Sequence, residues 1–275
     1  MSIDLLAPPR AGSTGRAVGA LRAIQLVVEG HWAWYRRNWR ASALSSFLMP
    51  VLLLVAMGFG LGTQVRPGPA TLGQPYVVYL APAVLVAALV QTAAGESTYP
   101  VLSAFKWAKT YWAVISTPIT VSQVFAGQLV WIALRLLAAG VAFLAVVACL
   151  GALTGPGVLL ALPAALLAAM AFGAWIVALA ASVTNEGTAF SAVFRFVVLP
   201  MTLFAGTYYP IDRLPEWARP VAWLTPMAHG NALARGAAFG NLDWLAAGGH
   251  VAYLLAMLVA GLLVAHWRFR VRLRV

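Results

Sequence analysis

Long apolar segments dominate the pattern of hydrophobic and polar positions along this chain. A helix that crosses a bilayer needs about 20 consecutive, mostly apolar residues. Six segments meet that requirement: 41–62, 76–95, 121–150, 158–183, 188–206 and 245–266. Prolines lie inside several of them, which a spanning helix tolerates when neighbouring helices re-satisfy the freed backbone groups. The pattern predicts an all-α membrane protein with six packed transmembrane helices.

Composition supports the same fold class. The chain is 62% hydrophobic and 9% charged, whereas soluble domains are about 45–50% apolar and about 25% charged. The net charge of +11 would favour nucleic acid as a partner of a soluble protein. Here the cations flank apolar segments, so we expect membrane lipids and no nucleic acid. The single cysteine, Cys149, excludes an internal disulfide.

The distribution of Lys and Arg predicts the orientation, because cytoplasmic loops carry an excess of both. With the N-terminus in the cytoplasm, twelve of these cations fall inside and four outside. We therefore expect both termini in the cytoplasm. Residues 267–275 would form a basic cytoplasmic tail, and residues 1–17, rich in Pro, Gly and Ser, a disordered one.

Two further segments have a distinct character. Residues 18–40 mix aliphatic, aromatic and arginine side chains, which suits an amphipathic helix lying in the membrane interface. The alternative is an ordinary basic, aromatic flank of the first span. Residues 207–240 are moderately apolar but too rich in Pro and Gly for a span. They predict an extracellular re-entrant segment, buried in protein or lining water.

No pattern in the sequence indicates covalent chemistry. The phosphate-binding pattern G-x-x-x-x-G-K-[ST] is absent, and no His or acidic cluster has metal-ligand spacing. No acid lies at the centre of a predicted span, which counts against an ion-coupled carrier. We expect no catalytic residue, no metal and no cofactor on this chain.

Two arginines, Arg135 and Arg195, lie inside predicted spans. A charge near the bilayer centre costs from about 2.5 to more than 10 kcal/mol, so each should face protein or a wet cavity. One interpretation is contact with an anionic headgroup of a lipid-like substrate. The other is structural, namely pairing with Glu96 or Glu186, or snorkelling to the cytoplasmic surface.

The cytoplasmic loop between the second and third spans is aromatic and carries paired lysines. Phe105, Ala108 and Trp112 would share one face of a short helix, spaced to lie in a groove on a partner protein. A helix resting on lipid is the alternative. Gly58 and Gly62 form a G-x-x-x-G pair, which predicts a close helix approach and a subunit interface.

Two ordered groups of motifs occur on this six-helix layout. The first comprises Tyr79-Leu-Ala-Pro82, Glu96-Ser-Thr-Tyr99, Phe105-Lys-Trp-Ala-Lys-Thr-Tyr111 and Thr117-Pro118. The second comprises Phe204-Ala-Gly-Thr-Tyr-Tyr-Pro210, Leu214-Pro-Glu-Trp217 and Thr225-Pro226. From about residue 25 onward the chain resembles the type-2 ABC exporter permeases, with the nodulation-factor and lipooligosaccharide exporter permeases as the nearest branch.

The resemblance implies two permease subunits, taken to be a homodimer, and a pair of ABC ATPase subunits in a bacterial cytoplasmic membrane. ATP and Mg²⁺ would bind to the partner ATPase. Residues 41–266 would be the transmembrane domain, and 99–112 would hold the coupling helix that docks on the ATPase. The expected ATPase-coupling residues are Glu96, Tyr99, Phe105, Lys106, Trp107, Lys109 and Tyr111.

The resulting hypothesis is a permease that exports an amphipathic, lipid- or glycolipid-like molecule. The family has no sharp substrate motif, so no binding residue can be transferred by position. The expected substrate path comprises Arg135, Arg195, Phe204, Tyr208 and Tyr209, and the expected dimer interface Gly58 and Gly62. Drug or antibiotic efflux by the same machine is the first alternative. An ion-coupled carrier and a membrane enzyme acting on lipids are the others.

Overall fold

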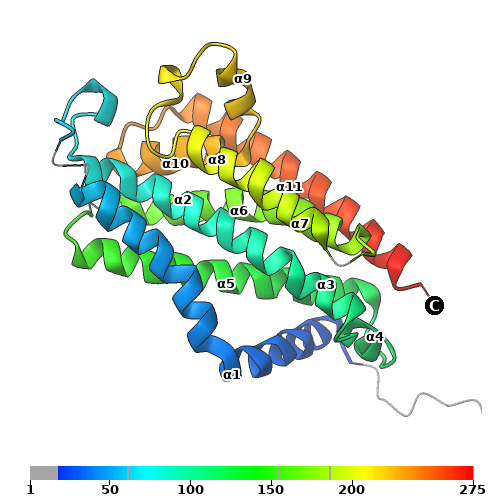
Figure 1. The fold of residues 1–275 in the computed structure, drawn as a ribbon. Coiled ribbons are helices and arrows are strands. Elements are labelled where there is room, and N and C mark those ends of the chain that lie inside the picture. The colour runs from blue at the N-terminus through cyan, green and yellow to red at the C-terminus, as the bar shows by residue number, and fades with distance from the viewer. Residues whose placement is uncertain are drawn as a thin grey trace, which may run out of the picture.

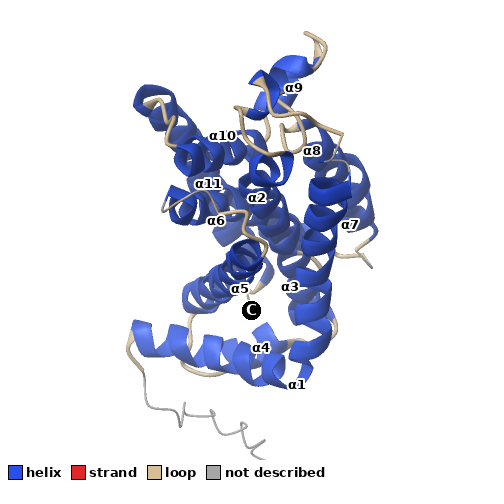
Figure 2. Ribbon diagram, turned by 90° about the vertical axis from the view of Figure 1, so that its left-hand side faces the viewer, coloured by secondary structure: helices blue, strands red, loops and turns tan. Residues whose placement is uncertain are grey.

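The structure is a computed structural model that describes residues 18–60, 62, 64–153, 155, 157–185 and 187–274. In this part of the chain all regular structure is helical, which confirms the predicted class (Figures 1 and 2). Among the described residues, four helical segments are long and apolar enough to cross a membrane: Tyr76–Lys106, Val121–Cys149, Gly157–Ser182 and Trp244–Arg272. The tail predicted at 1–17 lies outside the described residues.

The first helix, α1 (Ala20–Val55), joins two elements that the sequence analysis separated. It covers both the predicted interfacial helix and most of the first predicted span, and a π-helical turn, η1 (Ala56–Gly60), follows it. The helix continues because no Gly or Pro occurs between Gly30 and Pro50. Figure 1 shows that α1 bends, so its first half lies across the end of the bundle and its second half runs beside α2 (Tyr76–Ser97).

The centre of the bundle is formed by α2 and α6 (Gly157–Ser182), which pack against each other. The flanking helix α5 (Val121–Cys149) packs on α1 and α2, and α11 (Trp244–Arg272) packs on α6. Small residues make this closeness possible. The buried face of α6 is rich in alanine, including Ala161, Ala165, Ala168 and Ala169.

The fifth predicted span is a helix in three parts: α7 (Thr188–Val193), a π-helical turn η4 (Phe194–Val198), and α8 (Leu199–Phe204). Pro200 explains the interruption, because proline has no N–H group to donate and its ring clashes with the carbonyl four residues earlier in the helix. The 17 residues Thr188–Phe204 are apolar but shorter than the four candidate spans. Length and composition thus identify four of the six predicted spans.

The segments between the long helices gather at the two ends of the bundle. Two short helices, α3 (Tyr99–Lys106) and α4 (Thr110–Ile115), lie at the end that carries the C-terminus (Figure 1). The other end carries η3 (Pro69–Thr71), η5 (Ile211–Arg213), α9 (Ala218–Trp223) and α10 (Pro226–Phe239). Here α10 packs against α6, α2 and α11. The predicted segment 207–240 is thus broken into short helices, of which the last packs among the long ones.

The contact of α10 with the central helices gives a test of the fold. A Cβ atom at Gly230 would lie 2.6 Å from Ala168 Cβ and 2.9 Å from Val86 Cγ1. Gly230→Ala should therefore destabilise the protein by about 1–3 kcal/mol, seen as a lower melting temperature in detergent. Gly248→Ala is the control, because nothing lies within 4 Å of its added Cβ. It should be neutral or slightly stabilising, since Ala is the better helix former. Equal melting temperatures for the two variants would contradict this packing.

Candidate functional site

The α3–α4 turn presents a narrow tip at the C-terminal end of the bundle. Pro100 lies in the first turn of α3, where its missing N–H group leaves no bond unmade. The two helices are separated by a sharp reversal in which Lys109 has a left-handed backbone, with φ of 51°. Trp107, with 47% of its surface exposed, and Lys109 point outward, while Lys106 is half-buried with its ammonium 5.9 Å from the Trp107 ring centroid.

The inner side of this turn is an aromatic cluster. The rings of Phe105 and Tyr111 lie 4.8 Å apart, and Phe269 lies 4.8 Å from Phe105 and 5.4 Å from Tyr111. Phe125 of α5 lies 5.1 Å from Phe269. The buried Tyr111 hydroxyl donates a hydrogen bond of 2.8 Å to Gln128 Oε1. Phe105 and Tyr111 are therefore interior residues that hold the turn in place, which corrects their expected place on a docking surface.

The C-terminal segment contributes more than a basic tail. The helix α11 runs to Arg272, and its residues Phe269 and Leu273 are both buried. Arg272 donates a 2.9 Å hydrogen bond to the Ala180 carbonyl, and its guanidinium lies 4.4 Å from the Phe105 ring centroid. The sequence analysis missed the packing of this segment against the bundle. The available signal was the four-residue spacing of Phe269 and Leu273, which puts both on one helical face.

Tyr99 connects α3 to the start of the α7–α8 helix. Its ring packs edge-on against Phe190 at 5.1 Å, and its hydroxyl lies 3.5 Å from the Gly187 carbonyl. Nearby, Trp112 Nε1 donates a 3.1 Å bond to the Phe105 carbonyl, which closes the α3–α4 pair upon itself. The turn is thus joined to α7 at one side and to α5 and α11 at the other.

A buried ion pair lies directly before α3. Arg135 Nε and Nη2 each lie 2.9 Å from Glu96 Oε1, and the two side chains are 8% and 18% exposed. The Tyr35 ring covers the guanidinium, with its centroid 4.2 Å from Cζ. Arg135 therefore pairs with Glu96, as its structural interpretation expected. Glu96, which was predicted among the coupling residues, joins the end of α2 to α5.

The first half of α1 is held against α5 beside this ion pair. His31 stacks on Trp131 with ring centroids 5.6 Å apart, and Tyr35 meets the same indole edge-on at 5.7 Å. Burial lowers the pKa of His31 to about 4, so the imidazole is neutral at pH 7 and adds no second cation beside Arg135. On the same helix Trp32, Trp34 and Trp39 are exposed, as expected of a helix at a membrane interface.

The residues expected on the substrate path do not form one cluster. Arg195 is exposed within η4, on a different helix from the Arg135–Glu96 pair, and its suggested partner Glu186 lies outside the described residues. Phe204 is 48% exposed at the end of α8. Tyr208 and Tyr209 are half-buried in the following turn, where the Tyr76 hydroxyl donates to the Tyr208 carbonyl at 3.1 Å.

The two glycines expected at a subunit interface have different surroundings. A Cβ atom at Gly58 would lie 2.6 Å from Val77 Cγ2, so this glycine permits α2 of the same chain to approach. At Gly62 the nearest atom is Tyr76 Cβ at 3.6 Å, an ordinary contact distance. Contacts within the chain therefore account for Gly58, and its expected role between subunits stays a prediction.

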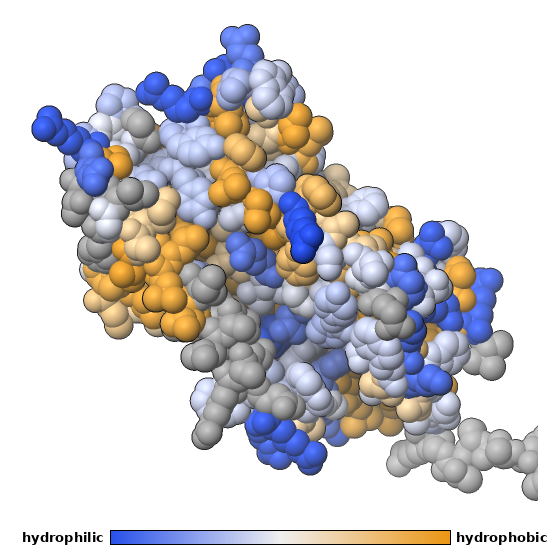
Figure 3. Space-filling view, viewed as in Figure 1, coloured by the Kyte–Doolittle hydropathy of each residue, from blue (hydrophilic) through white to orange (hydrophobic). Residues whose placement is uncertain are grey.

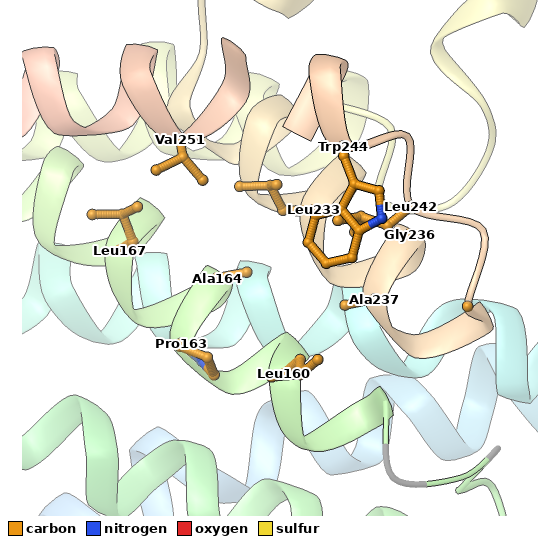
Figure 4. A pocket seen from close by; sticks show the side chains of 11 residues that line it. Leu160, Pro163, Ala164, Leu167, Leu233, Gly236, Ala237, Leu242, Trp244 and Val251 are labelled. Carbon is orange, nitrogen blue, oxygen red and sulfur yellow. The ribbon is translucent and has the colours of Figure 1, made fainter. Parts of the chain in front are cut away.

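A second feature is an apolar pocket at the other end of the bundle, between α6, α10 and α11 (Figure 4). Leu160, Leu167, Leu233, Trp244 and Val251 are among the side chains that line it, and no charged side chain does. The described residues also contain no group of three His, Cys, Asp or Glu that could hold a metal ion. The pocket offers no catalytic chemistry, so the α3–α4 turn and its supports remain the candidate site.

The ion pair yields a prediction about stability. Arg135→Met leaves the Glu96 carboxylate buried without its partner and should cost about 3–5 kcal/mol of unfolding free energy. The double variant with Glu96→Gln should recover most of that loss, because no unpaired charge remains. Arg22→Met is the control: it breaks an ion pair with Glu29 whose side chains are more than half exposed, worth at most about 1 kcal/mol. Denaturant titrations in mixed micelles measure the unfolding free energy of all three variants. A double variant that is less stable than Arg135→Met would contradict the pairing.

Comparison with known proteins places this chain in a family. Residues 22–239 match the family model described as ABC-2 type transporter. Nodulation protein J of Sinorhizobium fredii is 30% identical over 215 residues, covering 74% of this chain and 80% of that protein. Nodulation protein J of Bradyrhizobium diazoefficiens is 29% identical over 205 residues, covering 72% and 76%. Nodulation protein J of Rhizobium leguminosarum bv. viciae is 29% identical over 219 residues, covering 76% and 82%. A family match over most of the described helices, together with several candidate membrane spans, shows that this chain belongs to the ABC-2 type transporter family as a membrane-embedded transport subunit.

Proposed function

We propose that this chain is the permease subunit of an ATP-driven exporter in a bacterial inner membrane, energised by an ABC ATPase on a separate chain. The observation that carries the proposal is the construction of the α3–α4 turn. Its outer tip offers Trp107 and Lys109 to solvent, while its inner face is fixed by packed aromatic rings. A rigid, exposed tip of mixed aromatic and cationic character suits docking into a groove on a partner.

The supports of the turn suggest how force on the tip reaches the membrane helices. Displacing α3 pulls on α7 through Tyr99 and on α11 through Phe269. Because Glu96 lies in the last turn of α2, just before α3, the same displacement would strain its ion pair with Arg135 of α5. Closely packed interiors transmit such displacements rather than absorbing them. The chain itself performs no covalent step in this mechanism, and the ATPase pair supplies ATP and Mg²⁺ chemistry.

The six-span topology with both termini in the cytoplasm is part of the proposal. The second half of α1 and the α7–α8 helix would be the two spans beyond the four identified by length and composition. Seventeen residues at 1.5 Å each reach about 26 Å, a little less than the hydrocarbon thickness of about 30 Å. The turn after α8 and the helix α10 would complete the crossing as a re-entrant segment, which buries the broken backbone in protein.

The exposed face of α7–α8 supports an amphipathic, lipid- or glycolipid-like substrate. Phe196, Leu199 and Leu203 are exposed there together with Arg195, and Figure 3 shows hydrophobic side chains gathered over this side of the molecule with isolated hydrophilic ones among them. The apolar side chains would contact acyl chains, and Arg195 an anionic headgroup. The resemblance of the sequence to the nodulation-factor and lipooligosaccharide exporter permeases favours the same substrate class over drug efflux.

A second copy of this chain would pack against the side that carries the exposed face of α7–α8. The second half of α1 exposes Leu48, Leu52 and Val55 beside α2, and α7–α8 exposes its own apolar residues. Two such faces from two copies would enclose a path that is apolar on its walls and carries one Arg195 from each subunit. A homodimer therefore gives the exposed intramembrane arginines a sheltered location.

Charge reversal at the tip tests the docking role. The variant with both Lys106→Glu and Lys109→Glu should abolish most stimulation of the co-purifying ATPase in proteoliposomes, because two cations facing the partner become anions. Arg274→Glu is the control, an exposed reversal near the same end of the bundle, and should leave stimulation near the wild-type level. If the folded double variant still stimulates the ATPase and transports substrate at the wild-type level, the proposal is contradicted.

A further inference from the structure

The turn that follows α8 has an unusual set of backbone contacts. Four consecutive carbonyls, from Ala205 to Tyr208, accept hydrogen bonds from side chains of other helices. Asn231 Nδ2 donates to the Ala205 carbonyl at 2.8 Å, and Arg235 donates to the carbonyls of Gly206 and Thr207, the latter at 2.6 Å. The fourth carbonyl, of Tyr208, accepts from the Tyr76 hydroxyl. The donors come from α10 and α2, so this turn is fastened from two helices.

The chemistry of a helix end explains why an arginine is suited to this place. The carbonyls of Gly206 and Thr207 lie just beyond α8, which ends at Phe204, so they have no partner within the helix and lie near the negative end of its dipole. The guanidinium of Arg235 is always charged and presents several donors in one plane, so it can bind two successive carbonyls at once. Gly206, with φ of +79°, makes the turn that exposes them.

Arg235 also binds α2. Its guanidinium carbon lies 4.0 Å from the Tyr79 ring centroid, and Nε is 3.4 Å from the Tyr79 carbonyl. No carboxylate of the described residues forms an ion pair with it. The cation therefore depends on backbone carbonyls and one aromatic ring that belong to α2 and to the turn after α8, and these must move apart if a path opens between α2 and α8. A carboxylate on α10 would have anchored the charge to its own helix instead.

We propose that Arg235 is the positioning residue of an outer gate, in which side chains of α10 and α2 hold the turn after α8 closed through the carbonyls of Ala205 to Tyr208. The gating role rests on the proposed function, whereas the closure itself does not. Release of the guanidinium frees the turn that carries Tyr208 and Tyr209, so opening at this end requires α10 and α8 to separate. Asn231 supports the closure with a second bond of 3.2 Å to the Thr207 hydroxyl.

Accessibility of the turn to a reagent measures the closure directly. Thr207 is fully buried, so Thr207→Cys reports opening when Cys149, which is exposed, is replaced by Ala. The probe is a membrane-impermeant maleimide applied to the full chain in proteoliposomes. Arg235→Met, similar in length but without donors, should raise the labelling rate about tenfold or more. Tyr76→Phe, which removes one hydroxyl, should raise it by a smaller factor.

A cationic replacement separates this role from simple packing. Arg235→Lys restores the charge beside the turn after α8 and should return labelling most of the way to the parent rate, whereas a space-filling role predicts equal rates for Lys and Met. Arg219→Gln is the matched control, because Arg219 donates to the Leu214 and Asp212 carbonyls in the same outer segment. It should leave the labelling rate of the introduced thiol unchanged.

Three results would overturn the proposal: a parent-like rate in Arg235→Met, equal rates in Arg235→Met and Arg235→Lys, or the same rise in Arg219→Gln. If Arg235→Met does not fold, a parent-like rate in Tyr76→Phe overturns it. The labelling needs no ATPase, so failure of the proposed function would appear separately, as absence of ATP-dependent transport by the wild-type chain with its closure intact.

Discussion

A polypeptide in hydrocarbon has to satisfy its polar groups internally, and this constraint explains where the buried and half-buried cations of this chain lie. Arg135 is paired with Glu96, Arg235 binds two carbonyls of the turn after α8, and Arg272 binds the Ala180 carbonyl near the end of α6. Each of these contacts joins two different helices. The residues that are costly to bury are therefore the ones that fix how the helices are placed, and the apolar contacts fill the space between them.

The contacts that fix the two turns lie at the two ends of a bundle whose middle is packed through small side chains. At one end the α3–α4 turn is fixed by Phe105, Tyr111 and Phe269, and at the other the turn after α8 is fixed by Arg235. Between them α2 lies against the alanine-rich face of α6. Such an interior resists deformation, so movement imposed at one end is passed along whole helices to the other. That arrangement suits a permease driven by a partner.

The sequence predicted the long helices well because apolar length is a local property. The predicted segments 76–95, 121–150 and 158–183 lie within a few residues of α2, α5 and α6. The Arg135–Glu96 pair was also within reach, since a charge inside a span demands a partner. Three features were not predictable. Phe105 is buried by Phe269, which is distant in sequence; Gly58 meets Val77 across two helices; and Arg235 was counted only as an outer cation. Each depends on tertiary contacts that no local pattern encodes.

The central claim is that the α3–α4 turn docks on a separate ATPase, and contact at Trp107 tests it most directly. A photoreactive residue at this position, in membranes that hold the whole complex, should form a covalent adduct with a subunit carrying a phosphate-binding loop, identified by mass spectrometry. The same residue at Leu263, which is 65% exposed on α11, should label lipid and not that subunit. An intact complex in which position 107 gave no ATPase adduct, or in which both positions gave the same one, would contradict the account.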